Sequence, residues 1–487
     1  MGSQNNDNLK RSAFSSMIWK FAERVCARLV SLAVSIVLAR MLMPDDYSVV
    51  GIVAIFFAFC DVFVSGGLNA ALIQKKDAAI EDYSTVLYMN LMVALTLYLL
   101  MFFCAPMIAA LYEKPQLVAL IRVMGLTFFA NGLKSVLSAY ISSSLDFRKF
   151  FLSTIVGTVL SAAVGIFMAY KGMGAWALVG QQMTNTIVDT MILYWSTRMR
   201  IVRVFSVERI RSLFGYGWKI MLSSVVSVAY DQISPLIVGL RFTPADLAYY
   251  NKGKSFPGLI NDTVSDTLAA VLFPVMSKVQ DNKEDVLNIT RRYVKTASYV
   301  IFPLMAGMFA VSENFVRFLL TDKWLMATPY IQIFAVSYMF NLIQVGNLQA
   351  IKAIGRSDIT LVMEVLKKSI YFAIIAGFVF FANNPELFAF SSICCTAVAT
   401  LINTAPNRKL LNYSYRWQIA DILPNLLMSV VMGAAVMWLG TLPCAAGLLL
   451  LLQIAAGVLI YLALSILTRN ESFRYLLQFI LQTLKRG

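Results

Sequence analysis

The sequence has 487 residues, of which 59% are hydrophobic and 14% are charged, whereas soluble domains have about 45–50% apolar and about 25% charged residues. This composition excludes a soluble enzyme and predicts an all-α membrane protein built from bilayer-spanning helices of about 20 residues each. Histidine is absent, which excludes imidazole metal sites and histidine-dependent catalysis, and the net charge of +15 points to nucleic acid, anionic lipid or membrane topology.

Residues 1–14 are polar and no small-residue cleavage site follows the first apolar stretch, so we expect no removable signal peptide. Beyond them, apolar stretches separated by charged or Pro/Gly-containing breaks predict about 14 transmembrane helices. The six cysteines lie in these stretches and are interpreted as small core residues. The predicted spans are about residues 15–41, 46–70, 84–110, 117–142, 149–170, 174–197, 213–240, 245–276, 294–319, 327–351, 358–381, 386–405, 419–440 and 444–467.

The basic residues alternate between the two sides of the predicted membrane. With a cytoplasmic amino terminus, about 26 Lys and Arg residues fall in inward loops and about six in outward loops. Such an excess predicts a multi-pass membrane protein with both termini cytoplasmic. The net charge is thereby explained as a topology signal, so we expect no nucleic-acid partner.

Two similar halves are predicted from segments about 200 residues apart. Trp19-Lys20 and Pro44-Asp45-Asp46 correspond to Trp218-Lys219 and Pro244-Ala245-Asp246. Both halves start on the inner side, so the repeat is parallel, although chance similarity between two apolar helices is the alternative. The predicted parts are a cytoplasmic N-terminus (1–14), a six-helix bundle (15–197), a basic cytoplasmic linker along anionic lipid headgroups (198–212), a second six-helix bundle (213–405), two additional transmembrane helices (406–468) and an amphipathic cytoplasmic tail (469–487).

Arg24 and Arg28 lie near the middle of the first span, and Ser31 and Ser35 continue the same helical face. A basic residue facing lipid costs about 2.5–3.5 kcal/mol on insertion scales, so both arginines should face water, a partner or substrate. We favour a water-filled cavity over a purely structural interhelical pair, with Glu23 as a countercharge on the flank.

Further polar residues inside the spans extend the predicted cavity. Lys134 and Lys219 are close enough to span ends to reach the headgroups instead, and Glu364 and Lys368 can neutralise each other at i, i+4 spacing. The complete cationic set is Arg24, Arg28, Lys134, Lys219, Lys252, Lys254 and Lys368, with Glu23, Asn131, Gln182 and Asn185 as polar neighbours. The candidates for ion coupling are Asp231, Asp189, Glu364 and Asp61.

A cavity richer in Arg and Lys than in carboxylates favours an anionic cargo, and guanidinium matches phosphate oxygens particularly well. The sequence has no G-x-x-x-x-G-K-[ST] motif, so direct use of ATP is not expected. We therefore expect a transporter without cofactor or metal, with coupling to a Na⁺ or H⁺ gradient as one source of energy.

Four blocks carry a resemblance to a known family: LARMLMPDDYSVVGIVAIF (38–56), GGLNAALIQKKD (66–77), FTPADLAYYNKGKS (242–255) and VLFPVMSKVQ (271–280). With the span count, they make the chain resemble the Wzx-type polysaccharide flippases of the multidrug/oligosaccharidyl-lipid/polysaccharide (MOP) superfamily, in particular the colanic-acid-type exporters. A cation site in the second bundle is known in related branches, and Asp231 matches it only approximately, which leaves the coupling ion open.

The resemblance implies a V-shaped pair of bundles that works by alternating access. It would move polyprenyl-diphosphate-linked oligosaccharide repeat units, such as undecaprenyl diphosphate-linked ones, across the inner membrane for lipopolysaccharide or exopolysaccharide biosynthesis. Arg24 and Arg28 would hold the diphosphate or acidic sugars, and a polysaccharide polymerase and a chain-length regulator would be partners. The alternatives are a multidrug/cation antiporter of the same fold, whose cavity should be rich in carboxylates, and a membrane polymerase or ligase, which usually needs a large outer catalytic loop.

Overall fold

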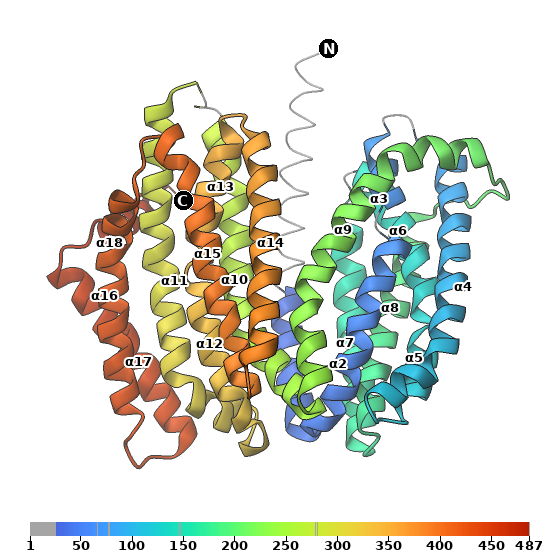
Figure 1. Ribbon diagram of the computed structural model, residues 1–487, viewed down its shortest axis with the longest axis horizontal. Coiled ribbons are helices and arrows are strands. Elements are labelled where there is room, and N and C mark those ends of the chain that lie inside the picture. The colour runs from blue at the N-terminus through green and yellow to red at the C-terminus, as the bar shows by residue number, and fades with distance from the viewer. Residues whose placement is uncertain are drawn as a thin grey trace. The chain divides into compact units, whose positions relative to one another are not determined.

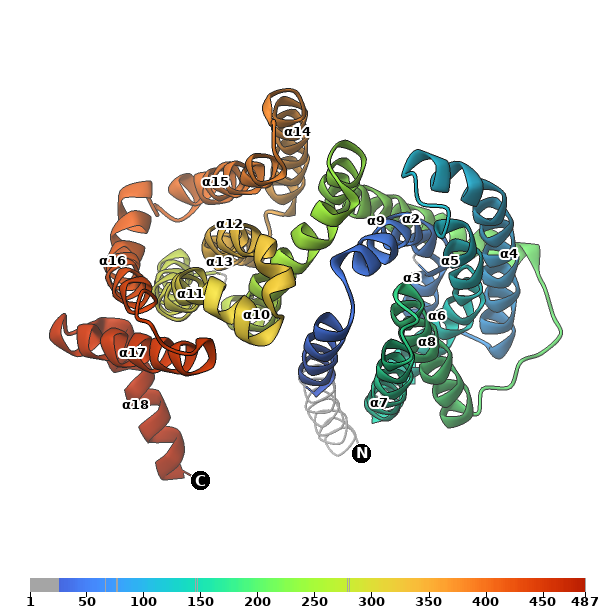
Figure 2. The ribbon, with the colours of Figure 1, turned by 90° about the horizontal axis from the view of Figure 1, so that it is seen from below.

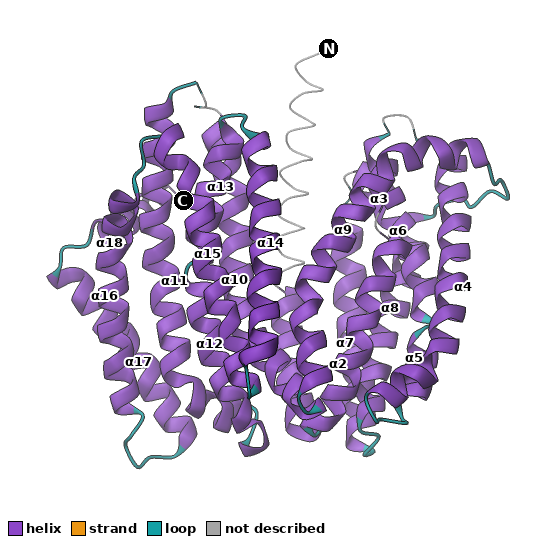
Figure 3. Cartoon of the chain, in the orientation of Figure 1, coloured by secondary structure: helices purple, strands orange, loops and turns teal. Residues whose placement is uncertain are grey.

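The computed structural model describes residues 26–65, 67–75, 78–144, 146, 148–277, 279 and 281–486. Over these residues the regular structure is helical and contains no strand (Figure 3), which confirms the predicted all-α class. The chain divides into two compact units, one up to Ala248 and one from Tyr249 onward.

The first unit contains a helical segment over residues 26–41 and eight labelled helices (Figure 1). They are α2 (Pro44–Ser65), α3 (Gly67–Gln74), α4 (Ile80–Leu111), α5 (Leu117–Met124), α6 (Thr127–Ser144), α7 (Arg148–Tyr170), α8 (Ala175–Thr197) and α9 (Val207–Arg241).

The second unit begins within α10 (Pro244–Ser277) and continues to the last described helix. Seen along the helices, α11 lies beside α16 and α17 (Figure 2). The remaining elements are α11 (Lys283–Leu319), the 3₁₀ helix η1 (Asp322–Ala327), α12 (Thr328–Met339), α13 (Asn341–Ala353), α14 (Ser357–Phe381), α15 (Pro385–Leu410), α16 (Tyr415–Leu439), α17 (Ala446–Leu467) and α18 (Glu471–Arg486).

Ten stretches of the described chain are long and apolar enough to cross a membrane. The other four predicted spans fall on the segment 26–41, whose predicted start is not described, and on α8, α10 and α14. Each of these last three helices carries intramembrane charges, for example Asp189, Lys252 and Lys367. Ionisable residues within spans are rare and usually functional, so the least apolar helices are where a site is to be sought.

The helix starts of α2 and α10 repeat the same hydrogen bond. The backbone N–H of Met43 donates to Asp46 Oδ2, and the backbone N–H of Thr243 donates to Asp246 Oδ2, both at 3.0 Å. Both helices open with a proline, which suits the first helical turn because that turn needs no backbone donor there. Matching bonds 200 residues apart (43 and 243, 46 and 246) support the predicted parallel repeat.

Helix α9 packs within the first unit. Leu213 of α9 is buried in a cluster with Leu72, Val86 and Leu137, and a Cβ at Gly217 would lie 2.8 Å from the carbonyl oxygen of Gly67. Contacts thus group α9 with the first bundle, whereas the sequence pattern places residues 213–240 at the start of the second. The helix also begins at Val207 with Ser206 as its N-cap, so the predicted linker 198–212 is nonhelical only over residues 198–206.

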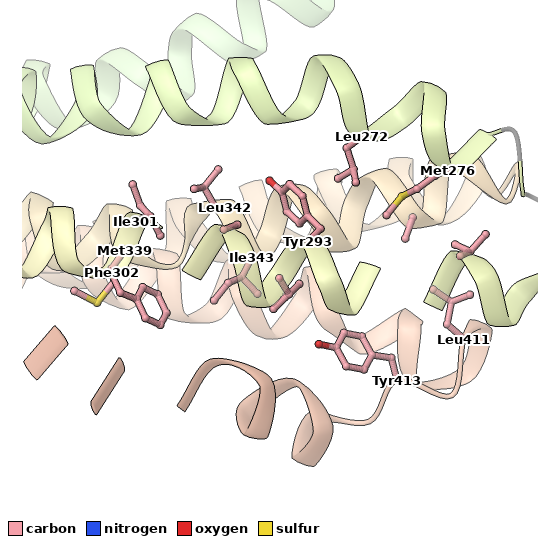
Figure 4. Packing of buried hydrophobic residues seen from close by; sticks show 14 of the residues in the cluster. Leu272, Met276, Tyr293, Ile301, Phe302, Met339, Leu342, Ile343, Leu411 and Tyr413 are labelled. Carbon is pink, nitrogen blue, oxygen red and sulfur yellow. The ribbon is translucent and has the colours of Figure 1, made fainter. Parts of the chain in front are cut away.

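The core of the second unit joins α10, α11, α12 and α13 (Figure 4). Met276, Phe302 and Ile343 from three of these helices are almost completely buried. Tyr413, in the connection between α15 and α16, belongs to the same cluster. Close packing gives these helices fixed relative positions, because lipid-surrounded helices associate mainly through van der Waals contacts and interhelical hydrogen bonds.

Candidate functional site

The first predicted pair of site residues is only partly described. Glu23 and Arg24 lie outside the described residues, whereas Arg28 is half-buried on the segment 26–41. This segment packs through Val34 and Leu38 in a cluster with residues of α7 and α8. Arg28 points about 120° around the helix from Val34, so it does not share the apolar packing face.

A polar cluster lies inside the first unit and joins α2, α6 and α8. The side-chain amide of Asn131 donates to Asp61 Oδ1 at 2.9 Å. One helical turn along α6, Lys134 Nζ lies 2.5 Å from Asp189 Oδ2. We call Asp61, Asn131, Lys134 and Asp189 the α2–α6–α8 cluster. Four residues that the sequence pattern singled out separately are thereby brought together.

The charges of the α2–α6–α8 cluster do not balance. Lys134 interacts electrostatically with Asp61 as well as with Asp189, so one ammonium faces two carboxylates. The Asp189 side chain is only 7% exposed, and its Oδ1 has no hydrogen-bond partner among the described residues. With all three groups ionised, the cluster carries one net negative charge. The unpartnered Asp189 Oδ1 can therefore bind a proton or a small cation. Lys134 is therefore one half of an ion pair, and its charge is already matched.

Small residues on α7 allow the polar face of α8 to lie close to that helix. A Cβ at Gly157 would lie 3.3 Å from Asn185 Oδ1 and 3.3 Å from the Asp189 Cβ. The predicted neighbour Asn185 is thus adjacent to the cluster at the α7–α8 contact, whereas Gln182 is exposed. Any larger residue at position 157 would push against both polar side chains.

Asn90 was not among the predicted site residues but lies beside the cluster. It is buried on α4, and its side-chain amide donates to the carbonyl oxygen of Gly132 at 3.3 Å. Gly132 lies between Asn131 and Lys134, so Asn90 ties α4 to the part of α6 that carries the site. An asparagine in an otherwise apolar stretch from Thr85 to Ala110 is the signal that could have identified it.

The other predicted cations do not join this cluster. Lys219 is exposed on α9, as is the carboxylate candidate Asp231. Lys252 is buried in the second unit, with its ammonium 5.6 Å from the centroid of Trp324 and 5.8 Å from that of Phe256. Lys254, on the same helix, is half-buried.

The expected pairing of Glu364 with Lys368 is wrong. Glu364 Oε1 contacts Lys367 Nζ at 2.6 Å instead, with i, i+3 spacing. Both lysines lie within reach of Glu364 on one side of a helix, so spacing alone does not separate them. Lys368 is half-buried on α14.

Solved transporter structures share this fold. The chain matches the lipid II flippase MurJ in an inward closed conformation with a TM-score of 0.76 and 15% identity, over 93% of this chain and 99% of that one. It matches an inward-facing MATE multidrug transporter of the MOP superfamily with a TM-score of 0.62 and 15% identity, over 79% and 94% of the two chains. The protein is therefore a polytopic α-helical membrane protein with the fold of the MOP transporters.

Sequence comparison specifies the family. Residues 37–329 match the family described as polysaccharide biosynthesis protein, and since this is more than half of the chain, the protein belongs to that family. All four blocks that carried the resemblance lie within the match.

Three relatives give the extent of the likeness. The teichuronic acid biosynthesis protein TuaB of Bacillus subtilis is 23% identical over 94% of this chain and 96% of its own length. The lipopolysaccharide biosynthesis protein WzxC of Escherichia coli K12 is 22% identical over 88% of each chain. The succinoglycan biosynthesis transport protein ExoT of Rhizobium meliloti is 25% identical, and that match spans 62% of this chain and 61% of ExoT.

Proposed function

We propose that the protein is a flippase that moves polyprenyl-diphosphate-linked oligosaccharides across the bacterial inner membrane by alternating access. Relatives named for teichuronic acid, lipopolysaccharide and succinoglycan biosynthesis support this function, and two of them match along most of their length. The observation that carries the proposal is the match to these relatives within the polysaccharide biosynthesis family, on a fold shared with solved transporters. The ionised α2–α6–α8 cluster inside the first unit adds support, because ionisable groups within a membrane are costly and usually mark a functional site.

In this proposal Arg28, together with Arg24, binds the diphosphate of the cargo. A guanidinium can donate two parallel hydrogen bonds to phosphate oxygens, which a lysine cannot do. Support comes from the position of Arg28 away from the face of its segment that packs against α7 and α8. The half-buried Lys254 and Lys368 are further candidates for contacts with acidic sugars.

The α2–α6–α8 cluster is proposed as the coupling site. A proton or Na⁺ at Asp189 would compete with Lys134 for the carboxylate, because the Lys134–Asp189 ion pair uses one of its oxygens and leaves the other unpartnered. Weakening this ion pair would loosen α6 from α8. Ion binding would then change the relative stability of two conformations, which is the requirement for coupling.

Transport by purified protein in liposomes tests the proposal. A fluorescent polyprenyl-diphosphate oligosaccharide placed in both leaflets becomes accessible to an external quencher at a rate that the protein should accelerate. Arg28→Gln should slow this acceleration at least tenfold, Arg28→Lys should slow it less, and the exposed Lys171→Gln serves as the control. Unchanged rates in Arg28→Gln would contradict the assigned role of Arg28, and no acceleration by the wild type would contradict the function.

A multidrug/cation antiporter is the second candidate. The likeness to MATE transporters and the excess of carboxylates over lysine in the α2–α6–α8 cluster favour it. Efflux of cationic dyes from cells that express the protein separates the two functions. Dye efflux that Asp189→Asn abolishes, without any movement of the lipid-linked sugar, would support the antiporter.

A further inference from the structure

A second charged site lies at one end of the second unit. There residues 288–296 of α11 and the first turn of α18 border a cavity of about 470 Å³. Three cations of α11, namely Arg291, Arg292 and Lys295, line this cavity together with Glu471 and Tyr475 of α18. Neither the family nor the proposed transport reaction assigns it a role.

Arg291 is already fully engaged by neighbouring groups. It donates two hydrogen bonds to Asp421 of α16, at 2.8 and 2.9 Å, and its guanidinium lies 4.4 Å from the centroid of the Trp417 ring. The Tyr413 hydroxyl donates to the same carboxylate at 2.9 Å. Arg291, which lines the cavity, therefore fixes α11 against α16 through its ion pair with Asp421.

The other two cations are less completely neutralised. Lys295 Nζ contacts Glu471 Oε2 at 2.7 Å and Asp421 Oδ1 at 3.5 Å. The Arg292 guanidinium lies 4.7 Å from the centroid of Tyr475, and within the described part of the chain no carboxylate lies at ion-pairing distance from it. Three cations face two carboxylates, so the cavity carries one net positive charge. A singly charged anion would balance it.

The position of the cavity indicates the kind of anion. Helix α18 starts four residues after α17 ends at Leu467, so its first turn lies where the chain leaves an apolar span. Leu467 and Ile466 at that end are 78% and 62% exposed. Trp and Tyr are enriched at the level of lipid headgroups, and Trp417 and Tyr475 both contact the arginines there. A headgroup in the cavity would have apolar surface beside it for acyl chains.

The backbone N–H groups at the start of α18 are not the hydrogen-bond donors that would bind the anion. Asn470 Oδ1 already accepts hydrogen bonds from the backbone N–H groups of Ser472 and Phe473, at 2.9 and 3.3 Å. Phe473 packs with the core cluster that contains Tyr299. The helix is thus held in place by its cap and its apolar side, and the side chains of Arg292 and Lys295 are the available donors.

We propose that this cavity binds the phosphate of an anionic phospholipid through Arg292 and Lys295. Glu471 competes with the lipid phosphate for Lys295, because its carboxylate already forms an ion pair with this lysine. The Glu471 side chain is itself 81% exposed. Lipid binding replaces the contact between Glu471 and Lys295 with one between the lipid phosphate and Lys295. The site would thereby connect the anionic lipid content of the membrane to the position of α18.

Substitutions with opposite expected effects test this site. Binding of phosphatidylglycerol to the full-length protein is measured by titration in phosphatidylcholine nanodiscs. Arg292→Gln should weaken binding about tenfold, the loss expected for one charge-assisted contact, whereas Glu471→Gln should strengthen it. Arg317→Gln, at the other end of α11 and paired with Glu313, is the matched control and should leave the affinity unchanged.

Competition experiments identify the source of the phosphate. Inorganic phosphate and a polyprenyl diphosphate are each added at the concentration of phosphatidylglycerol that half-saturates the protein. Little displacement by either supports a phospholipid site, and effective displacement by either would overturn that assignment. Equal phosphatidylglycerol affinity in Arg292→Gln and wild type, or weaker binding in Glu471→Gln, would overturn the site itself; thermal stability in phosphatidylcholine alone verifies that each variant is folded.

Discussion

Replacing Lys134 with methionine should destabilise the first unit by leaving Asp189 charged without its partner. The Asp189 side chain is 7% exposed and contacts Lys134 at 2.5 Å. Removing one partner of a buried ion pair costs about 3–5 kcal/mol. Lys134 is itself 36% exposed, so water reaches the pair from one side and we expect a loss near the lower limit, about 3 kcal/mol.

The matched variant is the double substitution Lys134→Met with Asp189→Leu. It removes both charges and keeps apolar volume, so most of the stability should return, since replacing a whole buried pair by apolar residues is often neutral. Reversible unfolding of purified protein in mixed micelles, followed by tryptophan fluorescence, measures both. A single variant as stable as the wild type, or a double variant no more stable than the single, would refute the view that the pair is buried and tightly coupled.

Three further predictions concern other parts of the chain. Gly217→Leu should push α9 from α3, because a Cβ there meets the Gly67 carbonyl oxygen at 2.8 Å; overpacking of this kind costs about 1–3 kcal/mol, and an unchanged melting temperature would contradict it. Asp46→Ala and Asp246→Ala each remove the same helix-start hydrogen bond and should each lose about 0.5–2 kcal/mol, measured by thermal unfolding; a clear loss in only one would argue against equivalent junctions. The hydrogen bond and charge of Lys295 lower the pKa of Glu471 below its usual 4.5, so the contact stabilises the docking of α18 above about pH 4.5 and is lost as the pH falls through the lowered pKa. The mobility of a spin label attached at the exposed Gln478 of α18 should accordingly increase at low pH in the otherwise unchanged protein, and an identical increase in Glu471→Gln would show that Glu471 is not the cause.

Hydropathy predicted the helices well because bilayer thickness imposes their length and composition. The predicted spans 149–170 and 444–467 correspond to α7 (Arg148–Tyr170) and α17 (Ala446–Leu467). The repeat was predictable as well, since proline and aspartate at the start of a helix act on adjacent residues and can be recognised in the sequence. The packing of α9 in the first unit was not, because the approach of Gly67 to Gly217 depends on two segments 150 residues apart.

The site was predictable as a set of residue types but not as a set of contacts. Lys134 and Asp189 were each conspicuous in an apolar span, yet their ion pair joins two helices and has no signature in local spacing. For the same reason the sequence placed Lys134 in the cationic substrate-binding set, with the lipid headgroups as the alternative, and not in an ion pair with Asp189. On α14, Lys367 and Lys368 are neighbours in sequence, and side-chain geometry decides that Glu364 contacts the first. The residues Glu23 and Arg24 remain sequence predictions.

The central claim is that mid-membrane arginines bind the diphosphate of a lipid-linked sugar during transport. Its most direct test is the flipping rate of a fluorescent polyprenyl-diphosphate oligosaccharide in liposomes that contain the Arg24→Glu/Arg28→Glu double variant. The variant should insert and fold like the wild type but move the lipid no faster than protein-free liposomes do. Transport at the wild-type rate by a correctly folded double variant would contradict it.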